Sequence, residues 1–308
     1  MKEVRQTGEY RYTFGPNYEP VATVEPGETF VVYTADAFEN RINRPEDLPS
    51  KVLSNVQFTN PQTGPILVKG AEKGDTLSVK ILNIEPLRKF AVSAFIPYFG
   101  GLTNTNSTPM LNEPLPERVF IYAIKDDKIE LENGVRIPYA PFLGTIGTAP
   151  EIESINTLTP GYWGGNMDCP ETCPGNEVQL PVFVKDAHFF TGDVHAAQGD
   201  GELCGVACEI PARVTIMLDV VKGKKIRWPR IISKEHIMAV GSARPMEDAA
   251  RIAWSELINF MVEEYGYEKL EAYQLLTQVG VMRVGNMVDP NYSLVAKCPK
   301  EYLRKHSG

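Results

Sequence analysis

Histidine is the scarce residue that most constrains the chemistry of this sequence. The 308-residue chain contains only His188, His195, His236 and His306. A metal site with more than one or two protein ligands must therefore draw on Asp and Glu, or on the five cysteines. We expect packing roles for His188 and His236, and a solvated position in a basic tail for His306. His195 is then the histidine that remains for a functional site.

Features of membrane and nucleic-acid-binding proteins are also missing. No run of about 18 apolar residues is present, and residues 1–15 lack the apolar segment of a signal peptide. We therefore expect a cytoplasmic protein with no membrane partner. The chain has 39 acidic and 31 basic residues, a net charge of −8, which argues against a nucleic-acid partner. An odd number of cysteines without a secretory signal makes a disulfide framework an unfavourable prediction.

Several catalytic signatures are absent as well. The sequence has no P-loop, no HExxH zinc motif and no G-x-S-x-G nucleophile elbow. The glycines at 199, 201 and 205 do not have the spacing of a dinucleotide-binding loop. The best-known nucleotide-binding, metalloprotease and serine-hydrolase motifs are thereby excluded.

The apolar segments that are present indicate a mainly β fold. Short strand-like stretches occur at residues 29–33 and 77–81, bounded by glycine-containing turns. Residues 214–220 alternate with a period of two, which is typical of a strand with one buried face. Lys222-Gly223-Lys224 follows directly and predicts a hairpin.

The pattern changes to helical spacing after residue 245. Apolar residues from Ala249 to Tyr265 recur at helical intervals, and Gly266 is a suitable C-cap. A second helical stretch places Leu270, Tyr273 and Leu276 on one face and stops at Gly280. We predict a single domain over residues 1–308, with a β-sandwich-like body at about 1–243. The helical appendage covers about 244–285, with the helix pair at about 246–280.

The segment most suited to chemistry is residues 192–202, GDVHAAQGDGE. In a strand, residues i and i+2 share a face, so Asp193 and His195 would project together, as would Asp200 and Glu202. The small residues between the two pairs would allow the backbone to double back and bring them to one point. Such a cluster could hold a divalent metal beside a general base. The alternative is a glycine-rich hairpin with a solvated acidic tip.

Two further positions are weaker candidates when taken alone. Asn166 and Asp168 again stand at i and i+2, after the tandem glycines of residues 160–168, PGYWGGNMD. A turn capped by Asn and Asp is the common structural explanation of that pattern. Asp36 follows the strand at 29–34, where a single Asp is usually a turn residue.

The cysteines leave one more alternative open. Cys169 and Cys173 follow one glycine-rich motif, and Cys204 and Cys208 follow the other, so a four-thiolate zinc site is conceivable. The spacing is wide for such a site, and Cys204 and Cys208 lie in an apolar run. Buried structural thiols are the favoured interpretation.

These motifs together resemble the acetamidase/formamidase family. The resemblance runs from about residue 25 to 300, and its most distinctive segments are residues 164–168 and 192–202. Similar segments are residues 34–37 (TADA), 63–66 (TGPI), 70–75 (GAEKGD), 137–151 (IPYAPFLGTIGTAPE) and 288–290 (VDP). The resemblance departs at Trp163, where many members carry a smaller side chain or a histidine.

The resemblance implies hydrolysis of a short aliphatic amide, such as formamide or acetamide, to ammonia and a carboxylate. It also implies a mainly β fold, a divalent metal and a homodimer or higher homo-oligomer. The site residues to which it points are Asp36, Asn166, Asp168, Asp193, His195 and Glu202.

Our hypothesis from the sequence assigns these residues to roles. His195, Asp36, Asp168 and Asp193 would bind the metal, with zinc favoured and calcium or manganese as alternatives. Glu202 would be the general base and then the general acid, and Asn166 would hydrogen-bond the substrate.

Two alternative functions stay open. One is a non-catalytic β module stabilised by metal, and the other is a thiol hydrolase that uses Cys169 or Cys204 with His195.

Overall fold

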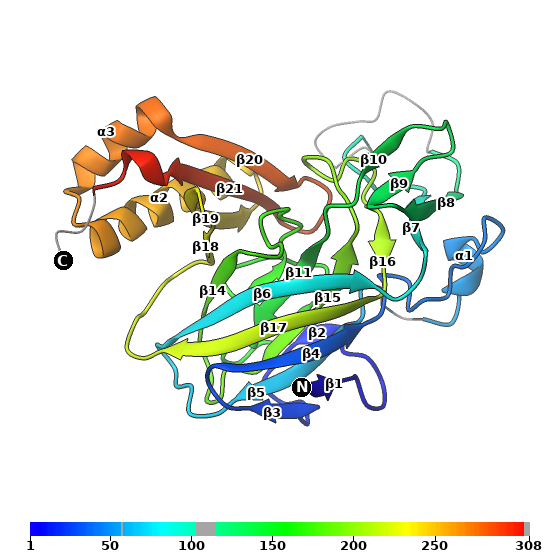
Figure 1. Cartoon of the computed structure of the whole chain (residues 1–308), viewed down its shortest axis with the longest axis horizontal. Helices are drawn as coiled ribbons and strands as arrows, with labels where there is room; N and C mark the ends of the chain where they lie inside the picture. The colour runs from blue at the N-terminus through cyan, green and yellow to red at the C-terminus, as the bar shows by residue number, and fades with distance from the viewer. Residues whose placement is uncertain (57, 103–114, 305–308) are drawn as a thin grey trace.

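The computed structural model describes residues 1–56, 58–102 and 115–304, and His306 lies outside these ranges. The described residues form a mainly β protein with a pair of helices near the C-terminus, which confirms the predicted fold class. Figure 1 shows the β body below and the helices with their supporting strands above it, on the left.

Two large sheets make up most of the described structure. The first runs in the order β1 (Lys2–Val4), β4 (Glu28–Thr34), β17 (Ala212–Val221), β6 (Thr76–Pro86), β14 (Glu177–Pro181), β18 (Arg230–Ile232), β19 (His236–Ala243), β21 (Tyr292–Pro299) and β20 (Val281–Asn286). The second runs in the order β10 (Arg136–Pro138), β9 (Lys128–Glu130), β8 (Arg118–Lys125), β7 (Phe90–Phe95), β16 (Glu209–Ile210), β15 (Phe189–His195), β11 (Phe142–Thr148) and β13 (Gly164–Asn166).

Shorter elements complete the described fold. Strand β5 (Gln62–Val68) pairs with β15, and β3 (Ala22–Val24) pairs with β5. The remaining elements are β2 (Thr13–Phe14) paired with β12 (Ile155–Asn156), the helices α1 (Pro49–Val52), α2 (Met246–Tyr265) and α3 (Lys269–Val279), and the 3-10 turn η1 (Lys300–Tyr302).

The main apolar core contains residues from both sheets. On β17 every second side chain from Ala212 to Leu218 is buried, as the period-two pattern predicts. Phe30 of β4 and Val79 of β6 join this layer, and Phe189 and Val194 of β15 contribute from the second sheet. The central strands of the two sheets are therefore held together by the burial of apolar side chains between them.

The hairpin predicted after residue 221 is wrong. Strand β17 lies between β4 and β6 and pairs with both, so neither of its edges is open to a further strand. The next strand in the chain, β18, pairs instead with β14 and β19.

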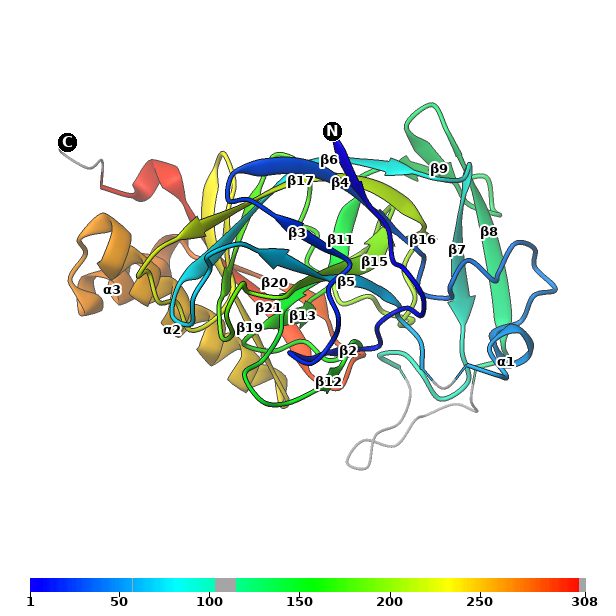
Figure 2. The same cartoon turned by 90° about the horizontal axis from the view of Figure 1, so that it is seen from below.

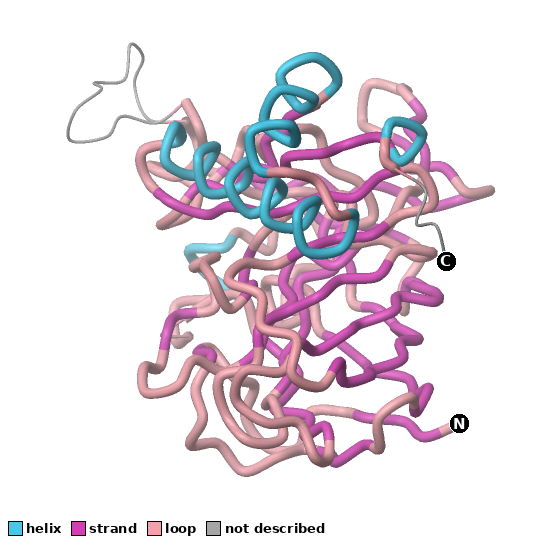
Figure 3. Tube along the Cα trace, turned by 90° about the vertical axis from the view of Figure 1, so that its left-hand side faces the viewer, coloured by secondary structure: helices cyan, strands magenta, loops and turns pink. Residues whose placement is uncertain are grey.

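The helix pair covers strands β19 and β21 (Figures 1 and 3). Helix α2 buries Ala253, Leu257 and Met261 against these strands, and it ends at Gly266, whose φ of 64° is left-handed. At Gly241 of β19 a Cβ atom would lie 2.2 Å from the carbonyl oxygen of Ala249, so the close packing of α2 requires glycine there.

The apolar face predicted for the second helix is partly wrong. In α3, Leu276 is buried, but Leu270 and Tyr273 are 68% and 62% exposed. The helix packs instead through the buried Ala272 and Leu276, and Leu275 and Val279 lie partly buried against the same apolar cluster. No helix among the described residues is long and apolar enough to span a membrane.

This topology places several distant segments beside one another. Strands β13, β11 and β15 are neighbours in the second sheet. The turn between β20 and β21 reaches them from the C-terminal layer, since Asn286 forms a parallel bridge with Gly201. Figure 2 shows β20 and β21 extending from the helices toward the β body. The functional candidates of the sequence lie at this junction.

Candidate metal centre

A buried cluster of acidic side chains surrounds His195 at the junction of the two regions. It comprises Asp193 and His195 from β15, Asp168 from the turn after β13, Glu202 from the connection to β16, Glu209 from β16, and Asp289 from the turn between β20 and β21. All six side chains are buried. The structure thus brings together four of the predicted residues: Asp168, Asp193, His195 and Glu202. The fifth, Asn166, lies beside them.

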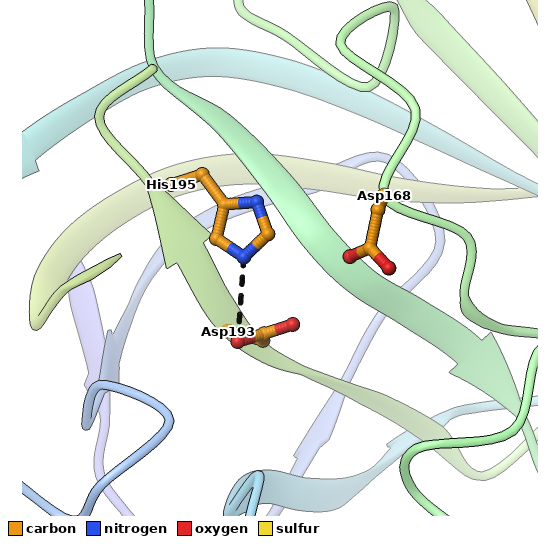
Figure 4. A group of neighbouring side chains, drawn as sticks. All are labelled: Asp168, Asp193 and His195. Carbon is orange, nitrogen blue, oxygen red and sulfur yellow. Dashed lines mark ion pairs between the residues drawn. The ribbon is translucent and has the colours of Figure 1, made fainter. Parts of the chain in front are cut away.

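Asp168, Asp193 and His195 form the most compact candidate for a ligand set. One potential ligand atom from each lies within 4.8 Å of the other two. Figure 4 shows the two carboxylates and the imidazole turned toward a common space, with Nε2 of His195 at 3.5 Å from Oδ1 of Asp193. Glu202 belongs to two adjoining groups, one with His195 and Glu209 and one with Asp168 and Asp289.

Gly144 of β11 leaves room for this space. A Cβ atom at Gly144 would lie 2.8 Å from Oδ1 of Asp168 and 2.8 Å from Oδ2 of Asp193. It would also lie 2.7 Å from the carbonyl oxygen of Asp193. Any side chain at this position would collide with the carboxylates, so their convergence depends on glycine.

The backbone is unusual at three of the acids. Asp168, Asp193 and Glu202 have φ values of 47°, 53° and 49°, a region that non-glycine residues rarely adopt. Each such residue costs on the order of 1 kcal/mol and persists where the surrounding structure demands it. In β15 the register of pairing with β11 is the same on both sides of Asp193, since Val194 pairs with Leu143 and Gly192 pairs with Thr145.

Gln198 orients the imidazole of His195. Its side-chain nitrogen donates to the carbonyl oxygens of Asp168 (3.0 Å) and Gly285 (2.9 Å), so its oxygen faces His195. Nδ1 of His195 then donates to that oxygen at 2.9 Å. With the proton on Nδ1, the lone pair of the neutral ring is on Nε2, the atom that faces the carboxylates.

Asn166 connects the cluster to a second buried network. Its side-chain nitrogen donates to Asp289 at 2.8 Å, and its oxygen accepts from Asn60 at 2.9 Å and from the hydroxyl of Thr145. Asn286 donates to Oδ2 of Asp168 at 3.1 Å. These contacts hold the amide of Asn166 and the carboxylates of Asp168 and Asp289 at defined positions.

The cluster has a large excess of negative charge. Burial raises the pKa of Glu202 to about 8 and that of Asp289 to about 7. Burial likewise raises the pKa of Asp168 and of Glu209 well above ordinary values. Burial alone would lower the pKa of His195, but the charges of the surrounding carboxylates outweigh it and raise that pKa. In the part of the chain that the structure describes, no Lys or Arg pairs with these side chains.

Asp36 is the predicted ligand that the structure does not bring into these groups. Its Oδ2 forms an ion pair of 2.6 Å with Arg88, and its Oδ1 accepts from the backbone N–H groups of Phe38 and Asn40. Burial raises the pKa of Asp36, while Arg88 acts in the opposite direction. The contacts of Asp36 are those of a residue that holds its own loop, and metal binding by it stays a prediction.

Asp200 does not join Asp193 and His195, although the sequence predicts that it would do so together with Glu202. It is exposed and forms an ion pair with Arg283. The segment turns back between Asp200 and Glu202, where Gly201 has a φ of 84°. Only Glu202 of this second pair therefore reaches the cluster.

The cysteines do not join the site. The five thiols are free, and none of the ligand groups among the described residues contains one. Burial raises the pKa of Cys169 well above its usual value, and it also raises the pKa of Cys204. Both thiols therefore favour the protonated form, which disfavours a thiol nucleophile. This agrees with the predicted packing role.

Four residues of the site were not assigned from the sequence. Glu209 had a visible signal, since it is a lone acid in the apolar run from Leu203 to Ile210. Gln198 and Gly144 lie inside the recognised segments, but spacing alone does not show their contacts. Asp289 follows the helix pair and reaches the site only because β20 and β21 return toward Gly201.

Part of the cluster forms the floor of a cleft of about 520 Å³. Asn166, Asp193, Glu202, Glu209 and Asp289 all contribute to its lining. A ligand that enters from outside can therefore reach these polar groups directly.

Fold and site together define a mainly β protein with a buried, carboxylate-rich candidate metal centre that opens to a cleft. The model of the acetamidase/formamidase family matches residues 1–159 and 151–304. The chain belongs to this family.

Solved structures agree closely with this assignment. An acetamidase from Yersinia enterocolitica is 45% identical, with a TM-score of 0.94, over 99% of this chain and 93% of that one. An acetamidase from Bacillus halodurans is 32% identical, with a TM-score of 0.89, over 97% of this chain and 98% of that one. The similarity extends over almost the whole length of each chain.

Curated relatives are more distant. The acetamidase of Mycolicibacterium smegmatis is 24% identical over 264 residues, 68% of this chain and 65% of that protein. The formamidase of Methylophilus methylotrophus is 24% identical over 283 residues, 74% of this chain and 69% of that protein. The chain therefore spans about two thirds of the length of these relatives.

Proposed function

We propose that this protein hydrolyses the C–N bond of a small amide to give ammonia and a carboxylate, with a divalent metal held by Asp168, Asp193 and His195. One observation carries the proposal: two carboxylates and an imidazole converge over Gly144, where a Cβ atom would collide with both carboxylates. Family membership supports the same reaction, since the relatives bear the names acetamidase and formamidase.

The donor atoms fit a cation. Oδ1 of Asp168, Nε2 of His195 and Oε2 of Glu209 are buried and make no hydrogen bond with any described residue. Buried polar atoms normally have partners, so three unsatisfied acceptors in one cluster fit the binding of a cation. A cation would also favour the ionised form of these carboxyls, whose pKa values burial raises. Asp36 is not in the proposed ligand set, because Arg88 already neutralises it.

Zinc is the metal that we propose. Three protein ligands with a position left open are typical of catalytic zinc sites, and imidazole with carboxylates is a suitable donor set. Calcium and manganese are the alternatives, since both accept carboxylate ligands. A bound divalent metal would supply Lewis-acid chemistry, polarising the amide carbonyl and making a water more acidic.

The residues around the proposed ligands have separate tasks. Asn166 lines the cleft and donates one side-chain N–H to Asp289, and its second N–H can donate to the carbonyl oxygen of the substrate. Glu202 is in reach of the same space and would accept a proton from the attacking water. It would then pass that proton to the departing nitrogen, which leaves as ammonia. A positive charge beside Glu202 would lower the pKa of its carboxyl. The carboxylate would then be ionised, as a general base must be.

One experiment tests the function as a whole. Metal content of the purified protein is measured by elemental analysis, and ammonia release from formamide and acetamide is followed before and after chelation. We expect about one bound metal per site, loss of turnover on chelation and recovery on adding zinc. Full activity in metal-free protein would overturn the metal assignment. Ammonia release from neither amide would favour the non-catalytic β module.

We further propose a homodimer or higher homo-oligomer, on the family resemblance alone. Size-exclusion chromatography with light scattering gives the mass directly, and a monomer at micromolar concentration would contradict this.

A further inference from the structure

The cleft above the acidic floor has walls of a different character. Its lining includes the side chains of Phe38, Leu53, Ile96, Phe99, Leu158 and Val206. Phe38 and Val206 are buried, and the other four are half-buried. The polar groups of the cleft are therefore gathered mainly at its floor, and hydrocarbon dominates the walls.

One polar pair on the wall is already satisfied. The backbone N–H and the hydroxyl of Ser50 both donate to the carboxylate of Glu117, each at 2.6 Å. This pair joins α1 to the residue before β8, and α1 lies beside β7 and β8 in both views (Figures 1 and 2). Because Ser50 and Glu117 bind each other, they compete poorly for a ligand, and the apolar side chains determine what the cleft prefers.

The cleft is larger than the amides named for the relatives require. Cavities of roughly 300–1,000 Å³ bury drug-sized ligands, and this one measures about 520 Å³. Formamide and acetamide have three and four non-hydrogen atoms, so either would occupy only the acidic floor. Water would then fill a space bounded by hydrocarbon, where it finds few hydrogen-bond partners.

We infer that the preferred substrate is a primary amide whose acyl group is an apolar chain or ring of roughly four to eight carbons, a size suited to a cavity of this class. This inference rests on the proposed amide hydrolysis and specifies its substrate. The amide head lies at Asn166, Asp193 and Glu202, and the acyl group extends between Leu53, Ile96 and Phe99. In the reaction R–CO–NH2 + H2O → R–COO⁻ + NH4⁺, the C–N bond breaks and a C–O bond forms. The proton that Glu202 takes from water goes to the leaving nitrogen.

The test is a series of amides on the metal-loaded full chain. We measure kcat/KM for acetamide, butyramide, hexanamide and phenylacetamide by ammonia release. Each buried methylene strengthens binding by about fourfold, so hexanamide is expected to exceed acetamide on the order of 10²-fold. Equal or lower kcat/KM for hexanamide, with acetamide hydrolysed, overturns this inference and leaves amide hydrolysis standing. No ammonia from any amide overturns both.

A matched pair of variants locates the effect in the cleft. Leu53→Asn places an amide in the apolar wall and should lower the ratio of kcat/KM for hexanamide to that for acetamide by about tenfold or more. Leu270→Asn makes the same change at an exposed position of α3 that does not line the cleft, and it should leave the ratio unchanged. Because partial unfolding lowers both constants together, the ratio reports substrate preference. An unchanged ratio in Leu53→Asn would contradict the inference.

Discussion

Two clusters of buried acids in this molecule are held in opposite ways. At Glu171, which is 6% exposed, Arg283 approaches to 3.0 Å and Lys297 also forms an ion pair. At the candidate metal centre, acids that are equally buried face one another and His195, and no Lys or Arg of the described chain pairs with them.

The difference separates carboxylates that stabilise the fold from carboxylates that form the proposed metal site. Burial alone would raise the pKa of Glu171, but hydrogen bonds and attraction from Lys297 and Arg283 outweigh it and hold that pKa below its ordinary value. In the metal centre the pKa values of Asp168, Glu202 and Glu209 are raised. Unpaired buried charge is costly, so a protein keeps it where binding or catalysis uses it.

The largest effect is expected at the proposed base. Glu202→Gln keeps the size of the side chain but removes the proton acceptor, so kcat should fall by about 10²–10⁴-fold. Metal content should be retained, because Glu202 is not among the proposed ligands. Ammonia release and elemental analysis on the same preparation measure both quantities.

Glu171→Gln is the matched control, since it makes the same change at a buried acid that is paired with Arg283 and Lys297. Its turnover should stay within a few-fold of wild type at neutral pH. Nearly normal turnover in Glu202→Gln would remove Glu202 from the mechanism.

The next effect tests whether the space over Gly144 holds the metal. In Gly144→Ala the new methyl group would meet Oδ1 of Asp168 and Oδ2 of Asp193 at 2.8 Å. Affinity for the metal should fall by at least about 10²-fold, since disturbing only the outer partners of a ligand already costs 10–100-fold. Titration of the chelated protein with zinc, followed by calorimetry, measures the change.

Gly199→Ala provides the comparison for this variant. Gly199 has no atom within 4 Å of the position that a Cβ would take. Zinc affinity should therefore stay unchanged. If Gly144→Ala bound zinc as tightly as Gly199→Ala, the proposed position of the metal would be wrong.

A smaller effect, on stability, is expected for Glu171→Gln. Loss of charge-assisted hydrogen bonds to Arg283 and Lys297 should lower the free energy of unfolding by about 1.5–3 kcal/mol at neutral pH. Because the folded pKa of Glu171 is lowered, this stabilisation is fully present above the ordinary value of 4.5 and is lost as pH falls through the folded pKa. Denaturant unfolding of both proteins from pH 7 downward should show the two stabilities converging. A difference independent of pH would contradict the ionic explanation.

The smallest effect is expected at Asp36. Like Glu171, this buried acid forms an ion pair with a basic side chain, Arg88. Asp36→Asn keeps an oxygen that can accept from Phe38 and Asn40 but removes the charge beside Arg88. We expect a loss of about 1–2 kcal/mol in the free energy of unfolding and unchanged metal content per folded molecule. Loss of metal in a folded variant would restore Asp36 to the ligand set.

Much of the local structure follows from the sequence alone. The alternation over residues 214–220 corresponds to β17, and the helical spacing that ends at Gly266 corresponds to α2. These patterns are informative because each depends on neighbours along the chain. The hairpin after β17 and the exposed Leu270 of α3 were misjudged, since partner strands and packing surfaces come from elsewhere.

In the site, too, the sequence predicts what depends on neighbours along the chain and misses what depends on distant segments. Asp193 and His195 could be paired from their spacing in one strand, and Glu202 from the glycines that let the chain turn back. Glu209 and Asp289 were not assigned, although Asp289 lies in the recognised segment 288–290, because a lone acid carries no sign of the segment that it will face. Asp36 and Asp200 have the sequence character of site residues, yet Arg88 and Arg283 pair with them.

The sequence by itself determined the kinds of element, their approximate ends and the segment that carries the chemistry. Only the tertiary structure decided which acids pair with an Arg or Lys side chain and which acids converge over Gly144. The physical reason is that the charge state and ligand capacity of a buried carboxylate depend on groups within a few ångströms. In this protein those groups come from β11, β13, β15, β16 and the β20–β21 turn, which folding alone brings together.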